Sequence, residues 1–202
     1  MMEHTAVDGS PLAPESLQMI EYLKKRAAEL TAVEICHRVR SAAQELEDHV
    51  SAVPPDQARR RPIAGKWTIA EVVDHISQTQ IRGAEELRHL LAGRRPPLPP
   101  VYEALRSGAG EWAPWEVLVG ELHQANRSMI EVLETAIDTV PVDEPKVRTV
   151  MVALCKLDDG TQKSQIWFAD LPWKQYALLQ RLHLLDHRTQ IKKLFAALSA
   201  SA

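Results

Sequence analysis

The chain has 202 residues, of which 45% are hydrophobic and 25% charged, and its formal net charge at pH 7 is −3. This composition is typical of one globular domain with its own core, and it excludes the strongly basic surface of a nucleic-acid-binding protein. No run approaches ~18 uninterrupted apolar residues, so we expect no membrane span.

The two cysteines, Cys36 and Cys155, are far apart and have no metal-binding or redox-motif spacing. Two reduced thiols are the simplest interpretation. The first residues also lack a basic segment followed by an apolar one, so we expect no secretory signal and a cytoplasmic protein.

Residues 1–14 are polar and contain Gly9, Pro11 and Pro14. They are expected to form a flexible N-terminal tail, followed by a single helical domain over residues 15–202.

A helical pattern covers residues 15–53. Thr31 and Glu34 have the spacing of a capping box, which predicts a short helix to about residue 30 and a main helix over 31–53. Pro54 and Pro55 end that helix because proline cannot continue the hydrogen-bond ladder.

A second capping box, Thr68 with Glu71, predicts a helix that runs to about Leu91. Gly83 lies inside this helix, where glycine costs about 1 kcal/mol relative to alanine, so a close neighbour is expected there. The proline-rich segment 93–100 then forms a stiff linker.

A third helix is predicted over residues 115–139. Residues 147–154 and 163–168 are rich in strand-forming side chains and flank the turn Asp158-Asp159-Gly160, which predicts a β-hairpin. A last helix follows Pro172 and runs to about Leu198.

The expected fold is therefore mainly α. It is a four-helix bundle of the up-down type, with a β-hairpin inserted between helices 3 and 4. Because an isolated hairpin is marginally stable, this one must pack on the helices or pair with another chain, and a homodimer is expected.

Two histidines occupy the apolar face of the last helix. His183 and His187 are four residues apart and continue a line of side chains that includes Tyr176, Leu179 and Ile191. A buried imidazole needs partners for both ring nitrogens, and a metal ion is one partner that two stacked imidazoles can share.

His75 on the second bundle helix can supply a third imidazole. Three neutral imidazoles that leave coordination positions open are typical of a catalytic metal site rather than a closed structural one. The alternative is that each histidine is satisfied separately by its own hydrogen bond.

Two segments resemble the DinB/YfiT-like superfamily of metal-binding four-helix bundles. One is Gly65-Lys66-Trp67-Thr68-Ile69-Ala70-Glu71-Val72-Val73-Asp74-His75-Ile76, and the other is His183-Leu184-Leu185-Asp186-His187-Arg188-Thr189-Gln190-Ile191. They occur in the order expected for that family. The resemblance implies a divalent metal, zinc or nickel, held by His75, His183 and His187.

Characterised relatives in that family include transferases and isomerases that use a low-molecular-weight thiol such as mycothiol or bacillithiol. The resemblance therefore implies a small-molecule substrate. The hairpin, the proline-rich linker and the N-terminal extension depart from simple members, so no particular substrate is carried over.

A metal ion can lower the pKa of bound water towards ~7 or hold a thiol as the nucleophilic thiolate. Asp186, three residues after His183, is the first candidate for moving protons, and Gln190 for orienting a ligand. Glu71 shares a face with His75, but the capping role is favoured for it. Asp74 is expected to be solvated, and Trp67 to close the end of the bundle.

Two functions follow from these residues. One is a metal-dependent enzyme, either a thiol S-transferase or a hydrolase. The alternative is a non-catalytic bundle that uses the metal for binding or sensing.

Overall fold

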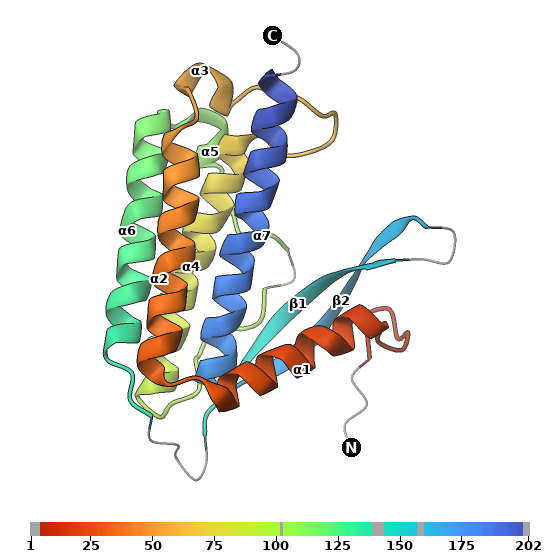
Figure 1. Ribbon diagram of the computed structural model, residues 1–202, viewed down its shortest axis with the longest axis vertical. Helices are drawn as coiled ribbons and strands as arrows, with labels where there is room; N and C mark the ends of the chain where they lie inside the picture. The colour runs from red at the N-terminus through yellow and green to blue at the C-terminus, as the bar shows by residue number, and fades with distance from the viewer. Residues whose placement is uncertain (1–4, 102, 139–143, 157–159, 200–202) are drawn as a thin grey trace.

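Four long helices form the body of the protein in the computed structural model, which describes residues 5–101, 103–138, 144–156 and 160–199. They are α2 (Ala32–Ser51), α4 (Ile69–Leu91), α6 (Trp115–Glu134) and α7 (Trp173–Ser199) (Figure 1). The predicted four-helix bundle is confirmed, although α6 ends before the expected residue 139.

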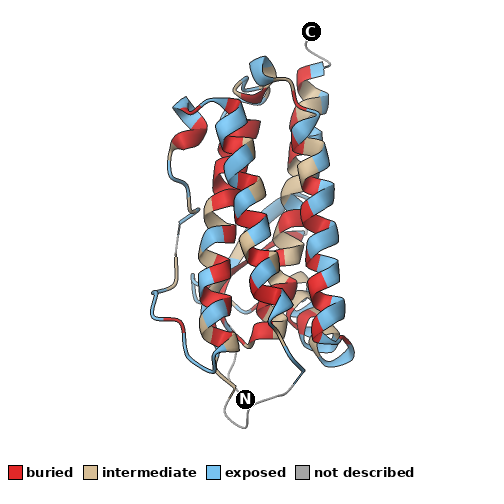
Figure 2. Cartoon of the chain, turned by 90° about the vertical axis from the view of Figure 1, so that its left-hand side faces the viewer, coloured by how far each residue is buried: buried red, intermediate tan, exposed pale blue. Residues whose placement is uncertain are grey.

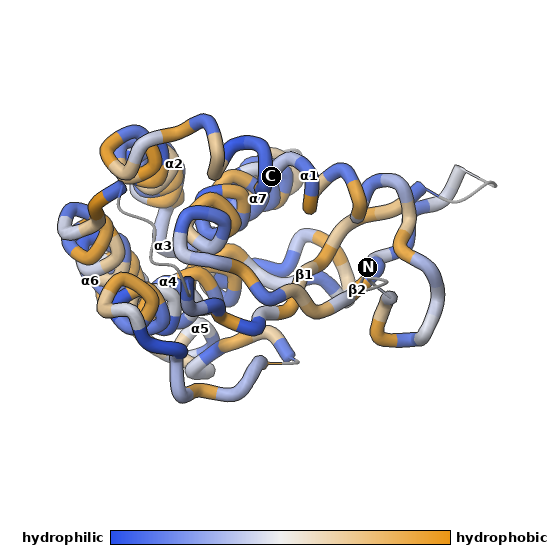
Figure 3. Tube along the Cα trace, turned by 90° about the horizontal axis from the view of Figure 1, so that it is seen from below, coloured by the Kyte–Doolittle hydropathy of each residue, from blue (hydrophilic) through white to orange (hydrophobic). Residues whose placement is uncertain are grey.

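A smaller unit lies beside one end of this bundle. It contains α1 (Pro14–Glu29) and the antiparallel hairpin of β1 (Val147–Lys156) and β2 (Gln162–Leu171), as the view along the bundle shows (Figure 3). The predicted hairpin between the third and fourth bundle helices is therefore confirmed. Two short helices, α3 (Pro55–Ala58) and α5 (Ala109–Trp112), lie in the connections.

The directions of the bundle helices differ from the expected up-down order. α7 runs antiparallel to α4, because Tyr176 hydrogen-bonds Glu86 near one end and His183 meets His75 further along. α2 runs parallel to α7, because residues 34–45 face residues 181–185 and later residues of α2 face later residues of α7.

α6 is antiparallel to α2, since Arg40 pairs with Glu134 and Glu47 accepts a hydrogen bond from Asn126. The chain therefore runs up, down, down and up through α2, α4, α6 and α7 (Figure 1). The cause is the connection after α4: it returns along α4 until Gly110 lies against Ala70, so α6 starts at the same end as α4.

Both predicted capping boxes are present. Thr31 and Glu34 cap α2, and Thr68 and Glu71 cap α4, each with reciprocal side-chain and backbone hydrogen bonds. Buried and exposed residues alternate along the helices, as expected for amphipathic helices around one core (Figure 2). At Gly83 an added Cβ would lie 2.7 Å from the Met129 Cε atom, so the predicted close approach is confirmed.

The hairpin packs through one face. Trp167 on β2 is fully buried and pairs with Met151 on β1, which is also buried. The N-terminal segment differs from the expected flexible tail, because Ala6 is buried and bridges to Trp167, and the Val7 amide donates to the Ile166 carbonyl. This isolated antiparallel bridge places the segment beside β2.

Residues 1–4 lie outside the described part of the chain, as do Asp158 and Asp159 of the expected turn. Gly160, the last residue of that turn, has φ of 81°, a backbone conformation that glycine adopts without strain. Among the described residues, no helix is both long enough and apolar enough to cross a membrane.

Candidate metal centre

Three histidine side chains meet between α4 and α7. The Nε2 atoms of His75 and His187 each lie 3.0 Å from the Nε2 atom of His183. One ring nitrogen from each of the three lies within 4.8 Å of the others, so the set could hold a metal ion. α4 supplies one imidazole and α7 supplies the i, i+4 pair, as the sequence predicted.

The other ring nitrogen of two of these histidines has a partner that fixes the tautomer. His75 Nδ1 donates to the Leu105 carbonyl oxygen at 2.8 Å, because a carbonyl can only accept. His187 Nδ1 donates to Gln190 Oε1 at 2.7 Å. In the neutral imidazoles, the Nε2 atoms of His75 and His187 therefore carry lone pairs.

All three imidazoles are held neutral. Burial, and the repulsion that a protonated His187 would add, lower the pKa of His75 from 6.5 to about 4. Burial likewise lowers the pKa of His183 far below its ordinary value, and that of His187, which Gln190 and Asp186 partly restore. At neutral pH none of the three rings therefore takes up a second proton.

Hydrogen bonds alone do not satisfy the cluster. If His183 carries its proton on Nε2, that one proton faces the lone pairs of both His75 and His187. The Nδ1 atom of His183 is then an acceptor without a donor, because it is buried and has no partner among the described residues. A proton on Nδ1 instead leaves three lone pairs converging at Nε2. A cation satisfies three converging lone pairs, so the residues present fit a metal ion better than separately bonded histidines.

Asp74 anchors the loop that orients His75. Its carboxylate accepts hydrogen bonds from Ser107 Oγ at 2.7 Å, from the Ser107 amide at 3.2 Å and from the Gly108 amide at 3.0 Å. The side chain is buried, so the expectation of a solvated Asp74 is wrong. The returning loop covers it and places the Leu105 carbonyl against His75 Nδ1.

Trp67 and Arg106 form one side of the site. The Trp67 ring centroid lies 5.1 Å from that of His75, and the Arg106 guanidinium lies 5.1 Å from the Trp67 centroid. Trp67 is half-buried, packs against the core and lies against His75. The positive charge of Arg106 lies close enough to His75 to contribute to its lowered pKa, after burial and His187.

Glu71 and Asp186 occupy different positions from the histidines. Glu71 caps α4 through Thr68 and forms ion pairs with Arg61 and Arg106, so the favoured capping role is confirmed. Asp186 is exposed on α7, and no hydrogen bond joins it to a histidine in the described parts of the chain.

Sequence reasoning missed the Leu105 carbonyl, Asp74 and Arg106. Two of them belong to an irregular loop without periodicity, so the sequence carries no signal for their position. For Asp74 a weak signal exists: it precedes His75 in a helix whose next connection is unusually long.

Solved structures of other proteins share the fold of this chain. No curated protein matches the chain. The crystal structure of a mycothiol-dependent maleylpyruvate isomerase is similar, with a TM-score of 0.59 and 13% identity, over 81% of this chain and 61% of that one. The present chain thus spans about three fifths of the isomerase.

YfiT from Bacillus subtilis, called a probable metal-dependent hydrolase with an unusual four-helix bundle topology, is also similar. Its TM-score is 0.53 and its identity 13%, over 83% of this chain and 87% of YfiT. At these identities the likeness concerns the fold. Residues 38–153, more than half of the chain, match the sequence pattern of the DinB superfamily, and the chain belongs to that family.

Proposed function

We propose that the chain is a metal-dependent enzyme that acts on a small molecule, either an S-transferase using a low-molecular-weight thiol or a hydrolase. One observation supports the proposal most directly: the Nε2 atoms of three neutral imidazoles converge, and hydrogen bonds among the described residues do not satisfy their lone pairs. His75, His183 and His187 are the proposed ligands. Zinc or nickel is the proposed ion, because the family resemblance implies these metals and imidazole suits both.

Three protein ligands leave positions on the ion for a small molecule. When bound, such an ion supplies Lewis acidity, which stabilises the deprotonated form of a thiol or of water. The chain's own residues orient the ligands: Leu105 holds His75 and Gln190 holds His187. Trp67 shields His75 from water on one side.

Asp186 is proposed as the group that exchanges protons with solvent. It is exposed, directly precedes His187 and lies one helical turn after His183. An Asp186→Asn variant is expected to retain its metal and to lose turnover by about 100-fold, the usual range for a general acid or base. Equal turnover in both proteins would remove Asp186 from the mechanism.

Metal content provides the first test. Elemental analysis of protein purified from metal-replete cells is expected to give about one equivalent of a divalent metal, with strong loss in His75→Ala and His183→Ala variants. His123→Ala is the matched control, because that histidine lies on α6, away from the cluster. Less than about a tenth of an equivalent in the parent protein would contradict the proposed site.

A non-catalytic binding or sensing role is the alternative. It is favoured by the exposed position of Asp186, which leaves no described carboxylate bonded to the cluster. A screen of electrophilic and hydrolysable substrates, with and without a small thiol, separates the two. Turnover that disappears in the His187→Ala variant supports the enzyme, whereas saturable binding without turnover supports the alternative.

A homodimer and a cytoplasmic location belong to the same proposal. Both cysteines are free and buried, which is compatible with a reducing compartment. Val152 and Ile166, cross-strand partners on the outer face of the hairpin, are exposed, as is Leu154. Sedimentation that detects only monomer at micromolar concentration would exclude the dimer.

A further inference from the structure

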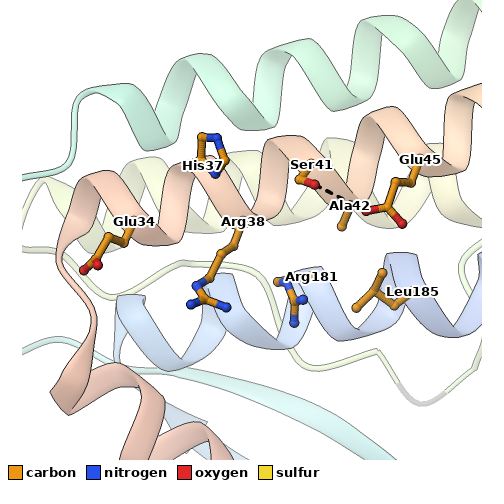
Figure 4. A pocket seen from close by; sticks show the side chains of 8 residues that line it. All are labelled: Glu34, His37, Arg38, Ser41, Ala42, Glu45, Arg181 and Leu185. Atoms are coloured by element: carbon orange, nitrogen blue, oxygen red, sulfur yellow. Dashed lines mark hydrogen bonds between the residues drawn. The ribbon is translucent and has the colours of Figure 1, made fainter.

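A second candidate site lies between α2 and α7. It is an open cleft of about 360 Å³, and the side chains that shape it come from positions 34–45 of α2 and from Arg181 and Leu185 of α7 (Figure 4). Arg181 and Leu185 flank His183 in sequence but face α2, whereas His183 faces α4. The cleft is therefore separate from the histidine cluster.

Two arginines in this cleft, the exposed Arg38 and the half-buried Arg181, have no acceptor among the residues that the structure describes. Arg38 extends from α2 towards α7, next to Arg181 (Figure 4). Neither arginine forms a hydrogen bond or an ion pair within the described parts of the chain, and the Nε atom of Arg181 is buried without a partner. A buried N–H without an acceptor is costly, and two adjacent cations repel each other.

The two carboxylates of the cleft are already engaged. Glu34 accepts hydrogen bonds from the Thr31 amide at 2.8 Å and from Thr31 Oγ1 at 2.9 Å, and it lies at the positive N-terminal end of α2. Glu45 forms an ion pair with Arg188 and accepts from Ser41 Oγ. Arg38 adds an attraction to Glu34, but the two are not hydrogen-bonded.

We propose that this cleft binds a small dianion, with Arg38 and Arg181 as its ligands. Two guanidinium groups from different helices can each donate two parallel N–H bonds to an oxyanion, and a double negative charge balances both. Tetrahedral oxyanions, of which phosphate groups are the common biological form, and dicarboxylates share this chemistry. The inference does not depend on a metal at the histidine cluster.

The test uses the 202-residue chain with its natural metal content and follows its backbone amide resonances by NMR spectroscopy. Sulfate and succinate are the two probes, and sodium chloride at equal ionic strength is the reference. The expected result is a saturable shift of amides at residues 34–45 and 181–185 with at least one probe. Sulfate alone would identify a tetrahedral-anion site, and succinate alone a dicarboxylate site.

Charge-matched variants then assign the ligands. Arg38→Gln and Arg181→Gln are each expected to weaken binding by about tenfold or more, since each removes a charge-assisted pair. Arg127→Gln changes the net charge equally but lies exposed on α6, so it should leave the affinity unchanged. Binding should also weaken as salt screens the partly exposed pair.

Two results would overturn the proposal. One is the absence of saturable shifts in the cleft with both probes in the folded parent protein. The other is equal weakening by Arg127→Gln and the two cleft variants, because that would reflect net charge alone. Metal content measured on the same samples keeps this outcome separate from the proposed histidine site.

Discussion

At the scale of single residues, the histidine cluster is defined by where its protons can be. Neutral His75 donates its only N–H to the Leu105 carbonyl oxygen, so its Nε2 atom presents a lone pair to His183. Burial makes the alternative, a second proton, unfavourable. The same atoms that prepare the site for a cation therefore make the metal-free protein sensitive to acid.

This sensitivity has a defined sign for His75. Its folded-state pKa is lowered from 6.5 to about 4 by burial, so below pH 6.5 the unfolded chain binds the proton more readily. With a chelator present, the unfolding free energy should fall as the pH drops from 6.5 to about 4. The contribution of His75 to this fall is about 3 kcal/mol.

Urea unfolding at several pH values measures this effect, and a His75→Gln variant provides the comparison. The variant should lose the part of the pH slope that belongs to His75 but keep the contributions of His183 and His187. If parent and variant have the same slope between pH 4 and pH 6.5, the assigned pKa shift of His75 is wrong.

Asp74 acts on the metal site through the loop. An Asp74→Ala change leaves the Ser107 and Gly108 donors without their acceptor, which should lower the unfolding free energy by about 1–3 kcal/mol. Because the loop then holds the Leu105 carbonyl less firmly, metal affinity should fall by about 10–100-fold. Competition with a chromogenic chelator measures this affinity.

An Asp74→Asn variant separates the two contributions. Its amide oxygen can still accept from one donor, so it should recover part of the stability and part of the metal affinity. Loss of stability without any change in metal affinity would mean that the loop does not position His75.

At the scale of elements, the contact between α5 and α4 determines where the loop can lie. A Cβ added at Gly110 would be 2.8 Å from the Ala70 carbonyl oxygen and from the Glu71 Cα, both of which are backbone atoms that cannot move aside. Gly110→Ala should therefore destabilise the protein by about 1–3 kcal/mol, the usual cost of overpacking, and should also weaken metal binding.

Gly120→Ala is the matched control for this change. That glycine lies in α6 with nothing within 4 Å of the added Cβ. Alanine there should stabilise the helix by about 1 kcal/mol without affecting the metal. Thermal unfolding of both variants measures the contrast, and destabilisation by both would show that the contact at Ala70 is not the cause.

The long helices and the hairpin were predictable because their residues have clear periodicity and because both capping boxes use local side chains. The histidine cluster was predictable for a related reason, since the i, i+4 pair His183 and His187 lies on an apolar face. The helix order was not predictable, because it depends on the path of the connection after α4. That segment is rich in proline and has no repeating pattern.

The same connection explains what was missed around the site. The burial of Asp74 follows from the position of Ser107 and Gly108, which only the folded chain reveals. Arg106 stacks on Trp67 for the same reason. The N-terminal segment is a second case, because its contact with Trp167 needs the hairpin in place, and no nearby residue signals it.

At the scale of the whole molecule, the histidine cluster connects parts of the chain that are distant in sequence. His75 and His183 are separated by 108 residues, and the loop that orients His75 precedes α6. An ion held there would join α4, the returning connection and α7. Because the unfolded chain cannot present these groups together, metal binding should stabilise the folded protein as a unit.

Metal removal should therefore lower the melting temperature of the entire protein. At a free metal concentration about 1,000 times the dissociation constant, binding adds about 4 kcal/mol. For a chain of this size that corresponds to a shift of about 10 °C. Differential scanning calorimetry with and without a chelator measures it. The His183→Gln variant should melt at one temperature under both conditions. If instead the chelator lowers the melting temperature of this variant as much as that of the parent, the stabilising ion binds elsewhere.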